Sequence, residues 1–413
     1  MISIAVIGYG VVGSGVVSVL DKNAERISQA AAQEIRVKYI LDIAAFPDSP
    51  YSSLFIKDFD TIVNDPEISI VVEAIGGVGA ALTYTRASLE AGKNVVTSNK
   101  ELVAEYGYEL MNLARERDVN YLFEASVGGG IPVIRPLLQC VTANIVTEIY
   151  GILNGTTNYI LTSMEKNGTS FTDALIEAQK KGYAESDPTA DIEGHDTCRK
   201  ICILSSLSFG KHIYPSQVPT EGITSVSAED MRFASQLGYE IKLLGRSKVV
   251  GEKVAVYVAP HLIMKDNLIS IVNFAMNGVV IRGNVVGNLV FCGAGAGKLP
   301  TASAVIADVI DASKHLKARR WIGWAEGDEN LISDPELLDC AWYIRTDAPR
   351  EKVEREFGAV IFADIPLNKD TQTPSYAADE TAFITSVISG KKVDELLARG
   401  INALSKFRVL GDH

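Results

Sequence analysis

The fold of this chain is indicated first by the segment Val6-Ile7-Gly8-Tyr9-Gly10-Val11-Val12-Gly13. A short apolar strand over residues 2–8 leads into it, and a helical stretch follows it to about residue 34. A second β-like run, Val37–Leu41, ends at Asp42. Strand, glycine turn, helix and strand in this order are typical of the opening of a nucleotide-binding βαβ unit.

The glycines have separate roles in such a unit. Gly8 permits the tight turn after the strand, Gly10 lets the backbone approach a pyrophosphate, and Gly13 lets helix and strand pack closely. The phosphate then sits against N–H groups of the first helical turn, which holds Val11 and Val12. The alternative is a tight turn that binds no ligand.

Asp42, at the end of the second strand, predicts a preference for NAD(H) over NADP(H). A carboxylate there accepts hydrogen bonds from the adenosine ribose and repels a 2′-phosphate. Two alternatives stay open. In the first, Asp42 is an ordinary strand-end residue without a role in cofactor choice. In the second, Lys57 binds the 2′-phosphate of NADP(H).

Strands and helices alternate as far as residue 125, so a parallel, doubly wound α/β sheet is expected. The expected elements are strands Ile68–Ala74, Asn94–Thr97 and Tyr121–Ala125 and helices Ala80–Ala91 and Glu101–Arg117. This nucleotide-binding domain covers residues 1–130. Residues 296–320, with a helix over Ala302–His315, are expected to complete it.

A second domain of α+β type is predicted over residues 131–295. Its helices are expected over Ile131–Cys140, Tyr159–Lys166, Phe171–Lys181 and His195–Phe209, with a polar loop at Gly182–Gly194. Its strands are expected over Glu148–Leu153, Ile241–Leu244, Val254–Val258, Ile269–Phe274, Gly278–Ile281 and Leu289–Phe291. Residues 335–413 read strand, helix, strand, loop, strand, helix, strand, which fits a small ferredoxin-like module.

Composition excludes several classes of function. The 413 residues carry a net charge of −12 without a basic cluster, which argues against a nucleic-acid partner. No apolar run is long enough for a membrane helix, and the N-terminus does not read as a signal peptide, so a cytoplasmic protein is expected. The five cysteines are scattered and contain no Cys-x-x-Cys, so neither a disulfide framework nor a zinc site is expected.

The segment Thr97-Ser98-Asn99-Lys100 falls where a strand gives way to a helix. It therefore lies at the carboxyl edge of the sheet, where doubly wound folds bind their ligands. Lys100 is placed to meet a nicotinamide or a substrate. The alternative is a solvated surface lysine.

Residues 178–200 carry the densest chemistry. Glu185, Asp187, Asp191 and Asp196 are among the carboxylates that lie within twelve residues of this segment. Asp196 and Lys200 are four apart, hence on one face of a helix that continues with apolar residues. Partial burial lowers a lysine pKa, which suits acid–base work. The alternative is a solvated acidic loop with a surface ion pair.

This segment resembles the signature of homoserine dehydrogenases, Ala-x3-Gly-Tyr-x3-Asp-Pro-x2-Asp-Ile-x-Gly-x-Asp-x3-Lys, and every fixed position is present. Four more segments resemble the same family, namely Ser98–Lys100, Glu124–Pro132, Gly151–Leu161 and Gly293–Ala304. Together with the first glycine motif, they span residues 8 to 304 in the family's order.

The resemblance implies roles for individual residues. Lys200 would be the acid–base residue at the C4 oxygen, with Lys100 beside it. Glu185 and Asp196 would hold the substrate, including its ammonium group. The substrate-binding residues implied are Glu185, Asp196, Asp191 and Tyr183, and the cofactor would also meet Ser98, Lys100, Gly182 and Gly297.

The resemblance also implies a monovalent cation, normally sodium. Mainly backbone carbonyls would serve it, in the loop that holds Glu124, Val127, Gly129 and Ile131. The enzyme would interconvert L-homoserine and L-aspartate 4-semialdehyde by hydride transfer with NAD, or alternatively NADP. A homodimer or homotetramer is expected, joined through the second domain.

The C-terminal module resembles the ACT regulatory domain of many family members, but the usual Asp-x-Pro-Gly-Val opening is replaced by Asp347-Ala-Pro349-Arg350-Glu351. Effector binding is therefore not implied. No aspartate kinase domain precedes residue 1, so the monofunctional form is expected.

Two rival functions stay open on the residues alone. A semialdehyde oxidoreductase that makes an acyl-phosphate needs a nucleophilic cysteine, and none of the five lies in a recognisable motif. A non-catalytic dinucleotide-binding regulator would keep the glycine motif and lose the carboxylate–lysine segment, which is intact here.

Overall fold

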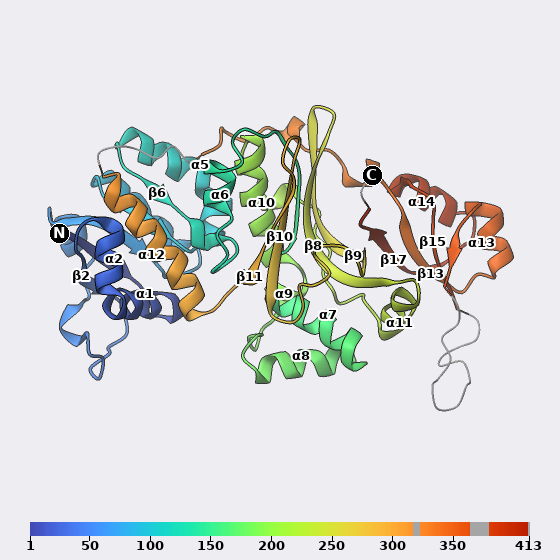
Figure 1. Ribbon diagram of the computed structural model, residues 1–413, viewed down its shortest axis with the longest axis horizontal. Coiled ribbons are helices and arrows are strands. Elements are labelled where there is room, and N and C mark those ends of the chain that lie inside the picture. Colours follow the sequence, from blue (N-terminus) through green and yellow to red (C-terminus); the bar gives the residue numbers. More distant parts are fainter. Residues whose placement is uncertain (317–322, 364–379, 412–413) are drawn as a thin grey trace.

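The N-terminal part of the molecule is built on a six-stranded parallel sheet (Figure 1). The computed structural model describes residues 1–316, 323–363 and 380–411. The strands, in the sheet order β3-β2-β1-β4-β5-β6, are β3 (Phe55–Ile56), β2 (Ile35–Leu41), β1 (Ile2–Ile7), β4 (Ile68–Glu73), β5 (Asn94–Thr97) and β6 (Tyr121–Leu122). The order reverses at β1, so a ligand crevice opens between the carboxyl ends of β1 and β4. The predicted doubly wound sheet is confirmed.

Helices cover this sheet on both faces. They are α1 (Val11–Lys22), α2 (Ala24–Ala31), α3 (Asp60–Val63), α4 (Gly79–Glu90), α5 (Lys100–Glu116) and the late helix α12 (Lys298–Lys314). In Figure 1, α12 runs beside α1. Gly15 permits this contact, because a Cβ there would lie 2.7 Å from the Lys298 carbonyl oxygen. The single helix expected to residue 34 is wrong, since Asn23 leaves helical geometry and caps both α1 and α2.

A nine-stranded sheet forms the rest of the molecule, in the order β11-β10-β7-β8-β9-β17-β13-β15-β14. Its first half consists of β7 (Val146–Ile152), β8 (Tyr239–Val250), β9 (Lys253–Met264), β10 (Met276–Gly283) and β11 (Gly287–Ala294). The helices packed around it are α6 (Ile134–Gln139), α7 (Gly155–Asn167), α8 (Phe171–Lys180), α9 (Thr189–Ile192), α10 (His195–Phe209) and α11 (Ala228–Gln236). Gly245 on β8 lets α10 lie close to the sheet, because a Cβ there would be 3.0 Å from the Ile201 side chain.

The sheet continues without a break into the C-terminal region. That region contains β12 (Asp339–Cys340), β13 (Trp342–Thr346), α13 (Arg350–Phe357), β14 (Ile361–Phe362), β15 (Thr381–Ile384), β16 (Ile388–Ser389), α14 (Gly390–Leu397) and β17 (Ala403–Val409). Strand β17 pairs antiparallel with β13 and parallel with β9. Of the module predicted over residues 335–413, residues 364–379 and 412–413 lie outside the described chain.

A buried ion pair adds a second link between the two halves of this sheet. The Arg345 Nε donates to Asp230 Oδ1 at 2.8 Å, and the Asp230 side chain is fully buried at the start of α11. Tyr343 and Ser405 hydroxyl groups donate to the same carboxylate. The C-terminal strands are therefore joined to β9 by backbone pairing and to α11 by side-chain hydrogen bonds.

Four further sequence-based element assignments are wrong. The strand expected over Ile269–Phe274 is a series of turns, because Asn267 and Ser270 side chains bond to nearby backbone and compete with strand pairing. The strand expected to Ala125 ends at Leu122, where a 3₁₀ turn (Glu124–Ser126) begins. The helix expected from Ile131 starts at Ile134, and the polar loop over residues 182–194 contains the short helix α9.

Candidate active site

A cavity of about 550 Å³ lies between the two sheets. Its lining comes from five places: the start of α5, the start of α7, the segment 181–200, Ala275, and the chain at residues 295–297. Lys100, Tyr183, Glu185, Asp191, Asp196 and Lys200, predicted to be catalytic or substrate-binding, all line it, as do Gly182 and Gly297. Folding thus brings the start of α5, in the first domain, against the acidic segment 181–200 of the second domain.

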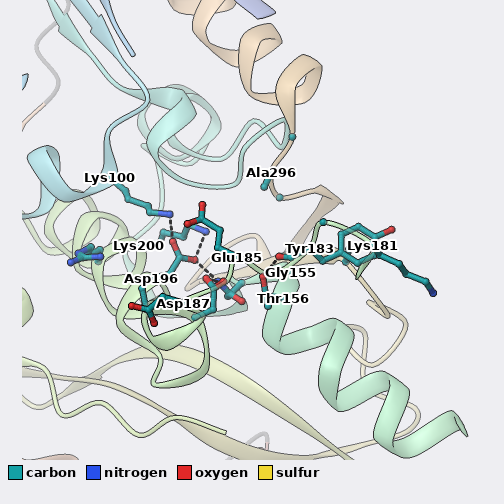
Figure 2. A pocket seen from close by; sticks show the side chains of 18 residues that line it. Lys100, Gly155, Thr156, Lys181, Tyr183, Glu185, Asp187, Asp196, Lys200 and Ala296 are labelled. Atoms are coloured by element: carbon teal, nitrogen blue, oxygen red, sulfur yellow. Dashed lines mark hydrogen bonds and ion pairs between the residues drawn. The ribbon is translucent and has the colours of Figure 1, made fainter. Parts of the chain in front are cut away.

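Asp196 is the centre of the charged cluster in this cavity, as Figure 2 shows. Its Oδ1 atom forms an ion pair with the ammonium group of Lys100. Its Oδ2 atom accepts a hydrogen bond from Lys200 Nζ at 2.7 Å, one helical turn along α10. Lys200 Nζ also donates to the backbone carbonyl of Leu153 at 2.7 Å. The carboxylate therefore holds two lysines from two different domains.

Burial separates the acid–base behaviour of the two lysines. Lys200 is 6% exposed, and burial lowers its pKa against the opposing charge of Asp196, with Lys100 adding to the decrease. Burial also acts to lower the pKa of Lys100, but the adjacent Asp196 carboxylate outweighs it and the net shift is upward. Burial acts to raise the pKa of Asp196, but the two ammonium groups hold it well below its usual range. Lys200 is thus the lysine better suited to release a proton.

Asn154 connects Asp196 to a second carboxylate. Its Nδ2 atom donates to Asp191 Oδ1 at 2.7 Å and to Asp196 Oδ2 at 2.8 Å. Burial raises the pKa of Asp191, and the charge of Asp196 raises it further. No role for Asn154 was predicted from the sequence, although the residue lies in Gly151–Leu161, one of the segments that resemble homoserine dehydrogenases.

The loop between α8 and α9 supplies the outer wall of the cavity. Figure 2 shows the Glu185 carboxylate turned toward the two lysines, whereas the side chains of Tyr183 and Lys181 point away from them. The Thr156 hydroxyl donates to the Tyr183 carbonyl at 2.6 Å and so ties this loop to the start of α7. Glu185 is exposed in the free protein and therefore accessible to a ligand.

The glycine motif forms the expected turn at the carboxyl end of β1. Gly8 has a φ of +92°, and a Cβ at Gly13 would lie 1.8 Å from the Gly8 carbonyl oxygen. Around Gly10, by contrast, the space beside the backbone is open. Val11 begins α1 and is exposed, with no side-chain cap at the N-terminus of the helix. Backbone N–H groups at this end are placed to face a phosphate.

Asp42 lies beside this turn and is fixed by the backbone around it. Its Oδ2 accepts the Tyr9 N–H at 2.7 Å, and its Oδ1 accepts the Ala44 N–H at 2.8 Å. Lys57 does not pair with the Asp42 carboxylate. It donates instead to the backbone carbonyls of residues 42, 43 and 44 at 2.6–2.9 Å.

Glu73, a buried acid behind the Ser98–Lys100 turn, was not predicted from the sequence to belong to the site. Glu73, fully buried at the end of β4, accepts hydrogen bonds from the Thr97 hydroxyl at 2.6 Å and from the Ile75 N–H at 2.8 Å. Burial raises its pKa. Asn99 caps α5 and also donates to the Gly77 carbonyl at 2.6 Å. Ser98 and Lys100 are thus presented at the sheet edge by a network that includes the loop after β4.

The loop predicted to hold a monovalent cation is buried beside the cavity. The Glu124 carboxylate accepts three backbone N–H groups at the start of α6 at 2.7–2.9 Å, so its oxygens are already used. Gly129 has a φ of +56°, and a Cβ there would lie 2.3 Å from the Gly295 carbonyl oxygen. The loop therefore packs directly on the segment that lines the cavity.

The backbone of this loop fits a cation better than its side chains do. Among the described residues, none donates a hydrogen bond to the carbonyl oxygens of Val127, Gly129 or Ile131, although all three residues are buried. Buried carbonyl oxygens without partners fit a hard cation such as sodium. The described ranges contain no group of three or more His, Cys, Asp or Glu side chains placed to hold a metal ion.

Fold and site together define a class of protein: an oxidoreductase that acts on a CH–OH group with NAD(P). Family models described as "Homoserine dehydrogenase" and "Homoserine dehydrogenase, NAD binding domain" match residues 132–310 and 8–124. The homoserine dehydrogenase of Neisseria gonorrhoeae is 43% identical, over 98% of this chain and 95% of that protein. The chain belongs to the homoserine dehydrogenase family.

Solved structures agree with this assignment. A homoserine dehydrogenase from Thiobacillus denitrificans superposes with a TM-score of 0.86 at 35% identity, over 99% of this chain and 98% of that one. A hyperthermophilic archaeal homoserine dehydrogenase in complex with NADPH has a TM-score of 0.64 at 27% identity, over 76% of this chain and 97% of that one.

All five cysteines lie in the described part of the chain, and none lines the cavity. A semialdehyde oxidoreductase that makes an acyl-phosphate would need a nucleophilic cysteine in its active site. Within residues 1–316, 323–363 and 380–411, no helix has both the length and the apolar character needed to cross a membrane.

Proposed function

We propose that the cavity binds L-homoserine or L-aspartate 4-semialdehyde and that Lys200 moves the proton at the C4 oxygen. The hydrogen bonds of Lys200 carry this proposal. An ammonium group has three N–H donors, and two of them go to Asp196 and to the Leu153 carbonyl. The third donor is left for the substrate oxygen.

The residues around the substrate oxygen act in both directions of the reaction. A dinucleotide bound beside the substrate would supply the hydride chemistry at the substrate C4 atom. In oxidation, neutral Lys200 takes the hydroxyl proton of homoserine. In reduction, its ammonium form donates a proton to the oxygen of the aldehyde. Lys100, held by Asp196, adds positive charge that stabilises the alkoxide as it forms.

The two ends of the amino-acid substrate need opposite charges. We assign the ammonium group to Glu185, Asp191 and Asp196, because their carboxylates line one cavity. The carboxylate end fits the N-terminus of α7, where Gly155 and Thr156 line the cavity and the helix dipole is positive. Tyr183 closes the outer side of the site through its backbone bond with Thr156.

We propose that NAD(H) is preferred over NADP(H). The dinucleotide would lie along Gly8–Gly13 and reach the cavity at Ser98, Lys100, Gly182 and Gly297. Asp42 supports the preference because its carboxylate is fixed beside the glycine turn, where the adenosine ribose lies in such domains. Lys57 is occupied by three carbonyl groups of the same loop, which disfavours its use as a phosphate ligand.

A sodium ion at the loop from Glu124 to Ile131 is part of the same proposal. The backbone carbonyls of Glu124, Val127, Gly129 and Ile131 would hold it. When bound, the ion would supply positive charge to buried oxygens and fix the loop that supports Gly295. The Glu124 side chain would keep its place at the start of α6.

We further propose a cytoplasmic homodimer or homotetramer. Exposed apolar side chains gather around the β7 and β10 strand ends: Ile145 is 69% exposed and Val285 is 78% exposed. Such a patch favours a protein interface. The domain limits of 130, 295 and 335 and the ferredoxin-like, ACT-like character of the C-terminal module remain predictions.

Homoserine-dependent formation of reduced dinucleotide by the purified chain tests the proposed function. The reverse reaction, with L-aspartate 4-semialdehyde and reduced dinucleotide, must run in the same preparation. Binding of dinucleotide without turnover in either direction would favour the non-catalytic regulator instead.

A further inference from the structure

Asn154 lies between two carboxylates of unequal surroundings. Its amide nitrogen has two hydrogens, and one goes to Asp191 and the other to Asp196, at 2.7 and 2.8 Å. Its Oδ1 atom accepts the Thr157 N–H at 2.8 Å and so caps α7. The side chain is 5% exposed. Both of its amide hydrogens are therefore used within the site.

The two carboxylates differ in the charges that stabilise them. Asp196 pairs with Lys100 and Lys200, whereas Asp191 forms no ion pair with any described residue. The charged groups that act on Asp191 are Asp196 and Lys200 on α10 and Lys100 on α5. Both lysines are already neutralised in part by Asp196, so the direct stabilising contacts of Asp191 are side-chain hydrogen bonds. The Asn154 amide comes first among them and the Thr156 side chain second, and the amide is the one that also contacts Asp196.

We propose that Asn154 is a positioning residue that keeps Asp191 ionised and directed at the ammonium group of the substrate. This inference rests on the proposed function, in which Asp191 contacts that group. Two carboxylates on one cavity wall repel each other, and an amide with one N–H for each reduces this repulsion without adding charge. A lysine here would instead compete with the substrate's ammonium group for the same oxygens.

The acid–base properties of the site agree with this role. Burial and the charge of Asp196 raise the pKa of Asp191, and the Asn154 hydrogen bond opposes that rise. Loss of the amide therefore moves the pKa of Asp191 further up. The substrate's ammonium group binds the ionised carboxylate. As the pH is lowered, kcat/KM for homoserine should therefore begin to fall at a higher pH in the variant than in the wild type.

Two substitutions separate the bridge from the helix cap. Asn154→Ser keeps a good N-cap for α7 but is too short to reach both carboxylates, whereas Asn154→Ala loses the cap as well. Asp191→Asn removes the charge itself. The measurements are kcat and KM for homoserine across pH, the Kd of the dinucleotide, and the melting temperature of each variant.

The expected result is specific to homoserine. Asn154→Ser should raise KM for homoserine on the order of ten-fold and move the acid limb of kcat/KM upward in pH, with the Kd of the dinucleotide unchanged. Asn154→Ala should show the same kinetic shift with an added loss of thermal stability. Asp191→Asn should raise KM as well and lose the acid limb that Asp191 causes.

The opposing outcomes are distinguishable. If Asn154→Ser keeps the wild-type KM and acid limb while Asp191→Asn impairs homoserine binding, the inference is overturned and Asn154 serves only as a cap. If Asp191→Asn binds homoserine normally, the substrate contact assigned to Asp191 is wrong and the inference loses its basis. A wild-type chain that does not turn over homoserine would contradict the proposed function itself.

Discussion

Lys200 Nζ lies 2.7 Å from Asp196 Oδ2, and the other oxygen of that carboxylate is paired with Lys100. One carboxylate thus joins a lysine at the start of α5, in the nucleotide-binding domain, to a lysine of α10 in the neighbouring domain. Because Asp196 is 3% exposed and Lys200 is 6% exposed, these two charges are shielded from water and interact strongly. The arrangement gives the two lysines different proton affinities, which is the basis of the mechanism proposed above.

The pH dependence of the two reaction directions should have opposite signs. Burial lowers the pKa of Lys200 below the ordinary lysine value. Oxidation of homoserine needs neutral Lys200, so its kcat should rise with pH through that pKa. Reduction of the semialdehyde needs the ammonium form, so its kcat should fall with pH through the same range. Rate profiles in both directions check this, and parallel profiles would speak against Lys200 as the proton carrier.

Glu185→Gln should impair the binding of homoserine more than its turnover. The substitution keeps the size of the side chain but removes the charge that faces the substrate's ammonium group. We expect KM for homoserine to rise about ten-fold or more, with kcat reduced less. Glu193→Gln is the matched control, because that carboxylate belongs to the same segment but does not line the cavity. Equal effects of the two substitutions would remove the special role of Glu185.

Asp42→Ala should weaken the preference for NAD(H). The carboxylate repels a 2′-phosphate and accepts a bond from a ribose hydroxyl, so its loss should raise kcat/KM for NADP(H) relative to NAD(H). The measurement is kcat/KM with both dinucleotides in wild type and variant. A wild-type preference for NADP(H) that the substitution leaves unaltered would show that Asp42 does not read the ribose.

Arg345→Leu should destabilise the chain strongly. It leaves Asp230 buried without its cation, and breaking a buried ion pair in this way costs about 3–5 kcal/mol of the free energy of unfolding. Lys392→Ala, which breaks the exposed pair with Glu395, is the control and should cost about 1 kcal/mol or less. Denaturant unfolding measures both. A difference below about 1 kcal/mol would mean that the C-terminal strands are not anchored through Asp230.

Much of the fold could be predicted because its signals are local. The strand Asn94–Thr97 and the helix His195–Phe209 were predicted to the residue, since each is a strongly patterned run with clear ends. The continuation of the central sheet into β17 could not be predicted. It depends on the pairing of Val409 with Leu262, far apart in the chain, and no local pattern encodes that contact.

The site was predictable in part for the same reason. The four-residue spacing of Asp196 and Lys200 placed them on one helical face, and the structure shows them in contact there. It did not show Asn154 or Glu73, because their roles arise from hydrogen bonds between separate segments. An acid at a strand end, such as Glu73, has no sequence pattern that shows it to be buried. An asparagine before a helix, such as Asn154, predicts only a helix cap.

The kinetics of Lys200→Ala in both directions test whether Lys200 carries the proton. We expect kcat for homoserine oxidation and for semialdehyde reduction both to fall by on the order of 10²–10⁴, while the Kd of the dinucleotide stays near the wild-type value. Lys200→Arg, which keeps the charge but cannot lose its proton, should remain impaired in oxidation. Near-normal turnover by a folded Lys200→Ala variant would contradict the account.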